Sequence, residues 1–252
     1  MEGAMNTKCC VFVDGENLRY SIIDLFRGEF DKAEYLPKKA DWTAFFDWLV
    51  NEIGHDISRF RTYWHVVEDI DFSPNIPLPK NNQSKLRQIL SRHAPYKTEL
   101  DQLTGTALLD KMEQLAIQCE RNANIMKKRF EGWRRIQNGI AITHRAVEFR
   151  RAGAIRFNCF TWELGNEKAV DVNLAMDMSE MRNIYEIALI VSGDGDYVPA
   201  VQIIKNSGKT VINVAFEARN GRLLPGGAWR LNQIADRPII VKYADVKRFL
   251  KI

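Results

Sequence analysis

The feature that most constrains this chain is an apolar run, Ile187–Val191, that ends abruptly in Ser192-Gly-Asp194-Gly-Asp196. Five apolar residues followed by a helical pattern indicate a buried parallel strand whose carboxyl end carries two acids. Open parallel sheets bind ligands just outside the carboxyl ends of their strands. Turn and helix-capping chemistry also accounts for both aspartates, so this motif alone leaves their role open.

A second strand with an acidic end lies near the N-terminus. The mostly apolar run Lys8–Val13 is followed by Asp14-Gly-Glu-Asn17 and then by residues at helical spacing. In a purely structural interpretation, Asn17 caps that helix and Asp14 serves the turn. Asp171 lies in the first turn of a later predicted helix, where the helix dipole favours a carboxylate. Each acid therefore has a structural explanation when it is taken alone.

Strands and helices alternate along most of the chain, which predicts an α/β fold. Further strands are expected at 59–67, 154–164, 209–216 and 238–241, and further helices at 41–50, 171–181 and 245–252. The rhythm breaks at a proline-rich loop, after which the chain is expected to be helical to about Ala152, with Gly139 as a candidate break. We predict a doubly wound, mainly parallel sheet with an inserted helical lobe. Its parts are a discontinuous α/β domain at 8–71 and 154–241, a lobe at 72–153, and a C-terminal helix at 242–252.

Composition excludes several classes of protein. The four cysteines show no CxxC pairing, so we expect reduced core residues and neither a zinc site nor a disulfide framework. The four histidines lack metal-ligand spacing. No apolar run is long enough to span a bilayer, so we expect a soluble, cytoplasmic protein without a membrane partner.

The net charge of +4 is unevenly distributed. The segment from Arg121 to Arg156 contains ten basic residues and two acidic ones, so the rest of the chain has a net negative charge. In the predicted lobe Arg121, Lys128 and Arg135 recur every seven residues, roughly 200° away from an apolar stripe on the same helix. Both a phosphate-binding stripe and a solvated helix face produce such a pattern. The residues expected to contact nucleic acid are Arg121, Lys127, Lys128, Arg134, Arg135 and Lys168.

If the first and fourth predicted strands are neighbours, four carboxylates converge at the carboxyl edge of the sheet. These are Asp14, Asp171, Asp194 and Asp196. They cannot all ionise at close range without compensation, which a hard divalent cation supplies. Oxygen ligands without cysteine or histidine indicate Mg²⁺ or Mn²⁺. Such an ion lowers the pKa of a bound water and favours in-line displacement at phosphorus, so the predicted reaction is phosphodiester hydrolysis. Asp177 points elsewhere on its helix and is expected to be structural.

Three motifs occur in order along the chain. They are Val13-Asp14-Gly-Glu-Asn17-Leu18, Lys168-Ala-Val-Asp171-Val-Asn-Leu-Ala-Met-Asp177 and Leu189-Ile-Val-Ser192-Gly-Asp194-Gly-Asp196-Tyr-Val-Pro-Ala200. Together they resemble the NYN domain of the LabA-like group, which is related to PIN-domain nucleases, over about 8–67 and 154–241. The resemblance implies a PIN-like sheet of order 3-2-1-4-5 and a metal-dependent ribonuclease site. It assigns the metal to Asp14, Asp171, Asp194 and Asp196, and assigns Asn17 and Ser192 to orienting metal waters or the phosphate.

The sequence departs from the family pattern at three positions and in one segment. The family commonly has glycine at Ala169, serine at Gly195 and phenylalanine at Tyr197, although every carboxylate is retained. The long segment 72–153 is not explained by the resemblance. We predict that it grips RNA through its basic stripe, with homodimerisation through its apolar stripe as the alternative.

Three functions are compatible with this sequence. The leading one is an Mg²⁺- or Mn²⁺-dependent endoribonuclease that acts on single-stranded or structured RNA, with tRNA among the candidates. The second is a non-catalytic RNA-binding or regulatory module with a remnant metal site. The third is another Mg²⁺ enzyme with an Asp-x-Asp motif, such as a transferase or a haloacid dehalogenase-type phosphatase. The phosphatase is disfavoured because Glu16 stands where a second aspartate is expected, and no glycine-rich phosphate loop supports a transferase.

Overall fold

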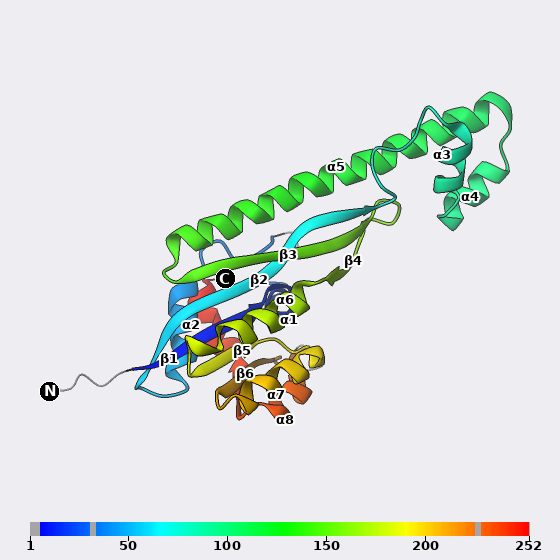
Figure 1. Ribbon diagram of the computed structural model, residues 1–252. Coiled ribbons are helices and arrows are strands. Elements are labelled where there is room, and N and C mark those ends of the chain that lie inside the picture. Colours follow the sequence, from blue (N-terminus) through cyan, green and yellow to red (C-terminus); the bar gives the residue numbers. More distant parts are fainter. Residues whose placement is uncertain (1–5, 31–33, 225–227, 252) are drawn as a thin grey trace. The chain divides into compact units, whose positions relative to one another are not determined.

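A mainly parallel β-sheet runs through the computed structural model, which describes residues 6–30, 34–224 and 228–251 (Figure 1). Its strands are β1 Thr7–Asp14, β2 Ile57–Ser73, β3 Val147–Asn158, β4 Glu163–Lys168, β5 Ile187–Val191, β6 Thr210–Glu217, β7 Leu223–Leu224 and β8 Arg237–Lys242. The hydrogen-bonded order is β4-β3-β2-β1-β5-β6-β7, and β8 pairs with β6. Strand β1 is parallel to both β2 and β5, whereas β4 and β7 pair antiparallel with their neighbours.

The predicted α/β class is confirmed, but the predicted strand order 3-2-1-4-5 is wrong for the sheet as a whole. The additional strand β4 comes from Glu163–Lys168, most of which lies between the strand predicted at 154–164 and the helix predicted at 171–181. Its residues have little intrinsic strand preference, and backbone pairing with β3 supplies the order that local propensity does not indicate. At the other end, β7 and β8 both pair with β6.

The helices agree with the predicted alternation, apart from the lobe. They are α1 Gly15–Leu25, α2 Trp42–Asn51, α3 Gln83–Leu90, α4 Ala94–Asp101, α5 Gly105–Thr143, α6 Val170–Glu180, α7 Val198–Asn206, α8 Ala228–Ile234 and α9 Tyr243–Leu250, with short 3₁₀ turns η1 Met181–Asn183 and η2 Gly195–Tyr197. Helix α5 continues through Gly139, so the expected break is wrong. Strand β3 begins at Val147, inside the segment expected to be helical, where Val147 and Phe149 alternate with charged residues.

The chain divides into two compact units. One contains Met1–Val66, Arg134–Ala152 and Ala169–Ile252, and the other contains Val67–Trp133 and Gly153–Lys168. The second unit therefore shares most of its residues with the predicted lobe, but its boundaries differ from those expected.

The core of the first unit covers both faces of β1 and β5. On one face Phe12 and Ile190 pack with residues of α6 and α7, including Leu174 and Val201, all of them fully buried. The other face carries aromatic residues of α2 and β2, among them a Trp42–Trp64 pair with ring centroids 4.9 Å apart. Each such buried side chain stabilises the fold by about 1.5–3 kcal/mol. This packing fixes the carboxyl ends of both strands.

The cysteines behave as the sequence predicts. All four are free and buried. Burial raises the pKa of Cys10 to about 12, so its thiol stays protonated at neutral pH. These residues are therefore small apolar core residues.

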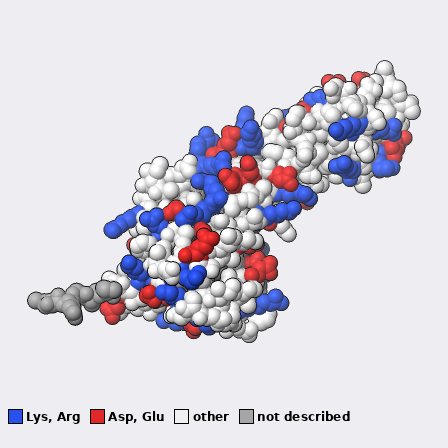
Figure 2. All heavy atoms as spheres, viewed as in Figure 1, with Lys and Arg blue, Asp and Glu red and all other residues white. Residues whose placement is uncertain are grey.

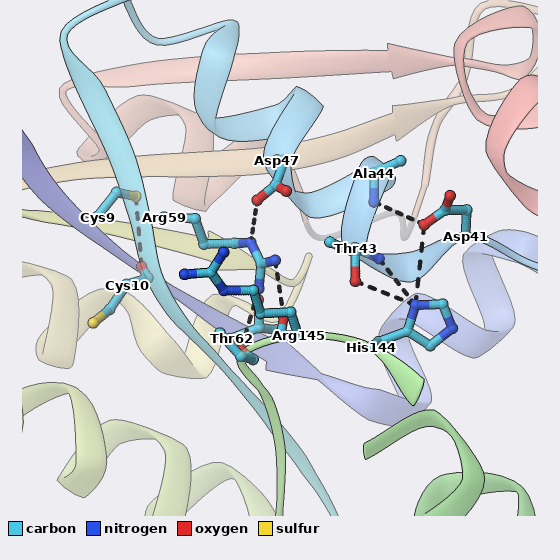
Figure 3. Close-up of polar contacts among 11 residues, drawn as sticks. Cys9, Cys10, Asp41, Thr43, Ala44, Asp47, Arg59, Thr62, His144 and Arg145 are labelled. Carbon is cyan, nitrogen blue, oxygen red and sulfur yellow. Dashed lines mark hydrogen bonds and ion pairs between the residues drawn. The ribbon is translucent and has the colours of Figure 1, made fainter. Parts of the chain in front are cut away.

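A buried arginine joins α2 to the segment that precedes β3 in the first unit (Figure 3). The Arg59 side chain is only 4% exposed and donates from Nε to Asp47 at 2.6 Å. Its terminal nitrogens donate to the carbonyl oxygens of Arg145 and Ala146 at 3.0 and 3.1 Å, and to Thr62 Oγ1 at 3.2 Å. One guanidinium thus donates to both carbonyl groups of this connection, and the Ala146 carbonyl also accepts from the Thr62 N–H at 2.8 Å.

In the second unit α3 and α4 lie beside the first part of α5, and their apolar side chains form a separate core. His93 stacks on Phe160 with ring centroids 5.3 Å apart, and Tyr96 meets Phe160 edge to face. The apolar stripe of α5, which includes Leu115, Cys119 and Met126, is buried. It is therefore not an open surface for dimerisation. In the described parts of the chain, no helix has both the length and the apolar character needed to cross a membrane.

Candidate active site

Asp14 is the last residue of β1 and is fully buried. It is the N-cap of α1, a role that the sequence interpretation gave to Asn17. The Asn17 backbone N–H donates to Asp14 Oδ1 at 3.1 Å, and the Asn17 amide donates to Oδ2 at 2.5 Å. Ser192 Oγ donates to the same Oδ2 at 3.0 Å. Burial raises the pKa of Asp14 to about 7; the charge of Asp171 adds to this effect, and the hydrogen bonds oppose it.

The turn after β5 is organised by its own side chains. Ser192 Oγ accepts from the Asp194 backbone N–H at 3.1 Å, and Asp194 Oδ1 accepts from the Asp196 N–H at 2.9 Å. Asp194 is thus the N-cap of η2. Its carboxylate is partly exposed and that of Asp196 is exposed, so both acids reach solvent.

Tyr197 connects the fourth candidate acid, Asp171, with Asp14. Its hydroxyl lies 2.9 Å from Asp171 Oδ1 and 3.3 Å from Asp14 Oδ2. Asp171 occupies the first turn of α6, as predicted. Burial raises the pKa of Asp171, the hydrogen bond from Tyr197 opposes this shift, and the charges of Asp194 and Asp196 add to it. The Tyr197 hydroxyl therefore links Asp14 to Asp171, and electrostatic repulsion couples Asp171 to Asp194 and Asp196.

Two neighbouring positions have structural roles. Ala169, where the family commonly has glycine, is the N-cap of α6 with φ 71°. A left-handed alanine costs about 1 kcal/mol more than glycine. Asp177 lies 3.0 Å from His65 Nε2 and 3.5 Å from Arg150 Nε, away from the acidic cluster's hydrogen bonds. Asp177 is the structural residue that its helical position predicted.

The donor set fits a hard divalent cation in its chemistry. All the candidate ligands are oxygens; the charge of Asp171 adds to the raised pKa of Asp14, and the charges of Asp194 and Asp196 add to the raised pKa of Asp171. However, no group of three or more His, Cys, Asp or Glu side chains within residues 6–30, 34–224 and 228–251 has the arrangement of a metal site. The Asp14 oxygens instead accept hydrogen bonds from Asn17, Ser192 and Tyr197. Binding an ion would require these acids to exchange hydrogen bonds for coordination.

The basic candidates are distributed between the two units. In the second unit Arg121, Lys127 and Lys128 are exposed on α5, and Lys168 is exposed at the end of β4. Two further residues of α5 belong to the first unit; Arg134 is partly buried and Arg135 is exposed. Lysine and arginine side chains gather along α5 in Figure 2, with acidic residues among them.

Two residues near the acids were not selected from the sequence. Tyr197 was noted only as a departure from the family pattern. The feature that could have identified it as a site residue is its hydroxyl, which can donate a hydrogen bond to an acid. Arg230 lies beside Gly195, which is the residue between Asp194 and Asp196. Its position follows from the packing of α8 and has no local sequence signal.

The fold and the site together define an α/β protein with carboxylates gathered at the ends of two adjacent parallel strands. The model of the NYN domain family matches residues 70–224, more than half of the chain, and the chain belongs to this family. NYN domains are generally ribonuclease-like, so membership indicates an RNA-related function. The match includes Asp171, Asp194 and Asp196, whereas Asp14 precedes it and joins them through Tyr197.

Other comparisons add little. No curated protein matches the chain. One solved structure, a protein of unknown function from Vibrio parahaemolyticus, is 13% identical, with 96% of each chain covered and a TM-score of 0.42. Similarity at this level supports no conclusion about fold or function.

Proposed function

We propose that this protein is a metal-dependent endoribonuclease of the LabA-like NYN group that hydrolyses RNA phosphodiester bonds. The observation that supports the proposal is that one hydroxyl links Asp14, at the end of β1, to Asp171, in the first turn of α6, beside the turn after β5. Asp14 and Asp171 share the hydroxyl of Tyr197, and Asp194 and Asp196 follow on the adjoining turn. Parallel sheets bind ligands just outside the carboxyl ends of their strands, and the neighbouring strands β1 and β5 both end here.

Asp14, Asp171, Asp194 and Asp196 would hold Mg²⁺ or Mn²⁺. Such an ion lowers the pKa of water and offsets the charge that develops on phosphate oxygens. Asn17 and Ser192 hold Asp14 in place through their donated hydrogen bonds. Their role is to keep one carboxylate oriented while the more exposed acids face the substrate.

In hydrolysis a water oxygen forms a bond to phosphorus, the bond to the leaving sugar oxygen breaks, and the water proton needs an acceptor. Asp194 and Asp196 reach solvent and are the carboxylates placed to receive it. The exposed cations of α5, including Arg121, Lys128 and Arg135, would contact phosphates and add affinity without sequence specificity. Single-stranded or structured RNA, tRNA included, is therefore the proposed substrate class.

A specific observation favours a second candidate, a non-catalytic RNA-binding module with a remnant site. Asp14 is fully buried and already hydrogen-bonded, and the described residues contain no ready-made metal cluster. A remnant site should bind Mn²⁺ no more tightly than an Asp194→Asn variant does. Titration of Mn²⁺ into both proteins by calorimetry distinguishes the two candidates.

The proposed reaction is tested by incubating a mixed pool of labelled RNAs and single-stranded DNAs with Mg²⁺, Mn²⁺ or EDTA. We expect metal-dependent cleavage of RNA that Asp194→Asn reduces by at least about 100-fold. Asp56→Asn is the matched control, since Asp56 is exposed and lies just before β2, at the other end of the strand from the site. Equal cleavage by wild type and Asp194→Asn would exclude this site as the source of activity.

A further inference from the structure

Arg230 of α8 lies directly against the acidic turn. A Cβ atom placed on Gly195 would be 3.1 Å from Arg230 Cδ and 3.6 Å from Arg230 Nη1. Gly195 separates Asp194 from Asp196, so the arginine stem crosses the backbone between the two acids. The absence of a side chain at Gly195 leaves room for the arginine stem.

The neighbouring residue presents an open aromatic face. Trp229 is 49% exposed, and the Arg230 guanidinium lies 5.5 Å from the centre of its ring. Helix α8 is anchored by Ala228 and Leu231, both fully buried, so the two intervening side chains project outward. Among the ion pairs of the described residues, none joins Arg230 to an acid, although two acids flank the glycine that it touches.

This combination is unusual for a purely structural surface. An exposed tryptophan contributes less to stability than a buried one, because much of its apolar area stays in water. An arginine beside two acids, but not paired with them, keeps its donors available for another anion. Both properties suit a ligand that offers a flat aromatic group and a negative charge a few ångströms apart.

We propose that Trp229 and Arg230 form a nucleotide subsite that holds single-stranded RNA beside the acidic turn. The Trp229 ring stacks on an unpaired base, and the Arg230 guanidinium contacts a phosphate of the same strand. In a duplex the base faces are covered by their neighbours, so only an unpaired nucleotide can use this surface. The subsite rests on the proposed function, because it supplies the strand that the acids would cut.

Two properties of the substrate follow from this geometry. Stacking depends on the π-face that all bases share, so the subsite tolerates any base at this position. Because Arg230 touches the turn that bears Asp194 and Asp196, the held nucleotide adjoins the scissile phosphate. Cleavage should therefore require at least one unpaired nucleotide next to the cut.

The test measures binding of a short fluorescein-labelled single-stranded RNA in EDTA by fluorescence anisotropy. Because stacking on an aromatic ring contributes to the binding of each base, we expect Trp229→Ala to weaken binding roughly tenfold and Trp229→Phe to restore most of it. Arg230→Gln should weaken binding and lower the salt dependence of log Kd by about one contact. Matched controls are Trp162→Ala, which removes another partly exposed tryptophan, and Arg182→Gln, which removes an exposed charge beyond the far end of α6.

The outcomes separate this inference from the proposed function. Weakened binding by the Trp229 and Arg230 variants, with unchanged controls, supports the subsite even if no cleavage is found. If the wild type cleaves RNA in a metal- and Asp194-dependent manner while these variants bind RNA as tightly as the wild type, only the subsite is refuted. A wild type that neither binds nor cleaves single-stranded RNA overturns both.

Discussion

A single hydroxyl group accounts for much of the arrangement of the acidic site. Tyr197 is 1% exposed, and its oxygen lies within hydrogen-bonding distance of both Asp171 and Asp14. A phenylalanine at this position would fill the same space but would leave Asp171 and Asp14 without this hydroxyl. Tyr197 is therefore a positioning residue whose effect is felt through the acids it holds.

Tyr197→Phe should destabilise the metal-free protein by about 1–3 kcal/mol, since a hydrogen bond to a charged group is lost without a change of shape. Urea unfolding in EDTA measures the difference. With saturating Mn²⁺ the deficit should shrink, because the ion would then compensate the acids. Tyr20→Phe is the control for an exposed ring. Equal stability of Tyr197→Phe and wild type in EDTA would show that the hydroxyl does not hold the acids.

The raised pKa of Asp14 predicts a pH dependence of stability. A carboxyl whose pKa is higher in the folded protein binds more protons there than in the unfolded chain, so stability falls as pH rises from about 3.8 to about 7. The loss is at most about 4 kcal/mol for a shift of this size. Metal-free Asp14→Asn should lack this slope and exceed the wild type in stability at pH 8. Parallel slopes for the two proteins in urea unfolding between pH 5 and 8 would contradict this assignment.

Among the elements of the fold, the positions where strands end were easier to predict from the sequence than the number of strands. The strand that ends at Asp14 and the strand that precedes Asp194 are buried on both faces, and continuous apolar runs identify such strands. Strand β4 contains mostly exposed polar residues and exists through its pairing with β3, which no local pattern encodes. The same distinction applies to the candidate site: the strand ends indicated Asp14 and Asp194 as candidates, whereas the contact of Arg230 with Gly195 depends on how α8 packs.

The connection between α5 and β3 depends on Arg59. Replacing Arg59 by methionine should cost about 1–3 kcal/mol, because the Arg145 carbonyl and the Asp47 carboxylate lose their donor, whereas the Ala146 carbonyl keeps the Thr62 N–H. Arg61→Met is a matched control on the same strand; its side chain is 45% exposed and pairs with Glu148, a surface contact worth less than about 1 kcal/mol. Chemical denaturation of both variants measures the difference in stability. Comparable losses of stability would show that Arg59 does not hold this connection in place.

In the molecule as a whole, the candidate catalytic acids and part of the basic stripe lie in different segments of the sequence. The acids lie in the first unit, and part of the basic stripe lies in the second, as exposed residues of α5. Neither hydropathy nor charge pattern indicated that residues 134–152 belong with the acids and 153–168 with the helices. Long-range packing determines that division, which is why the predicted lobe boundaries differ from the observed units.

Replacing Arg121, Lys127 and Lys128 together by glutamine should weaken RNA binding equally for unrelated sequences. It should also reduce the slope of log Kd against log salt by up to about three contacts, because phosphate contacts release counterions. The single variant Arg182→Gln serves as a control for loss of surface charge. An unchanged salt slope in the triple variant would identify the stripe as a solvated helix face.

Asp14, Asp171, Asp194 and Asp196 are proposed to form a divalent-metal site at one edge of the sheet. The most direct measurement is anomalous diffraction from crystals of the wild type and Asp194→Asn grown with Mn²⁺. We predict a manganese peak among Asp14, Asp171 and Asp194 in the wild type, with little or no peak in the variant. A fully ordered wild-type site without manganese at saturating concentration, with Asp14 still bonded to Asn17, Ser192 and Tyr197, would contradict the claim.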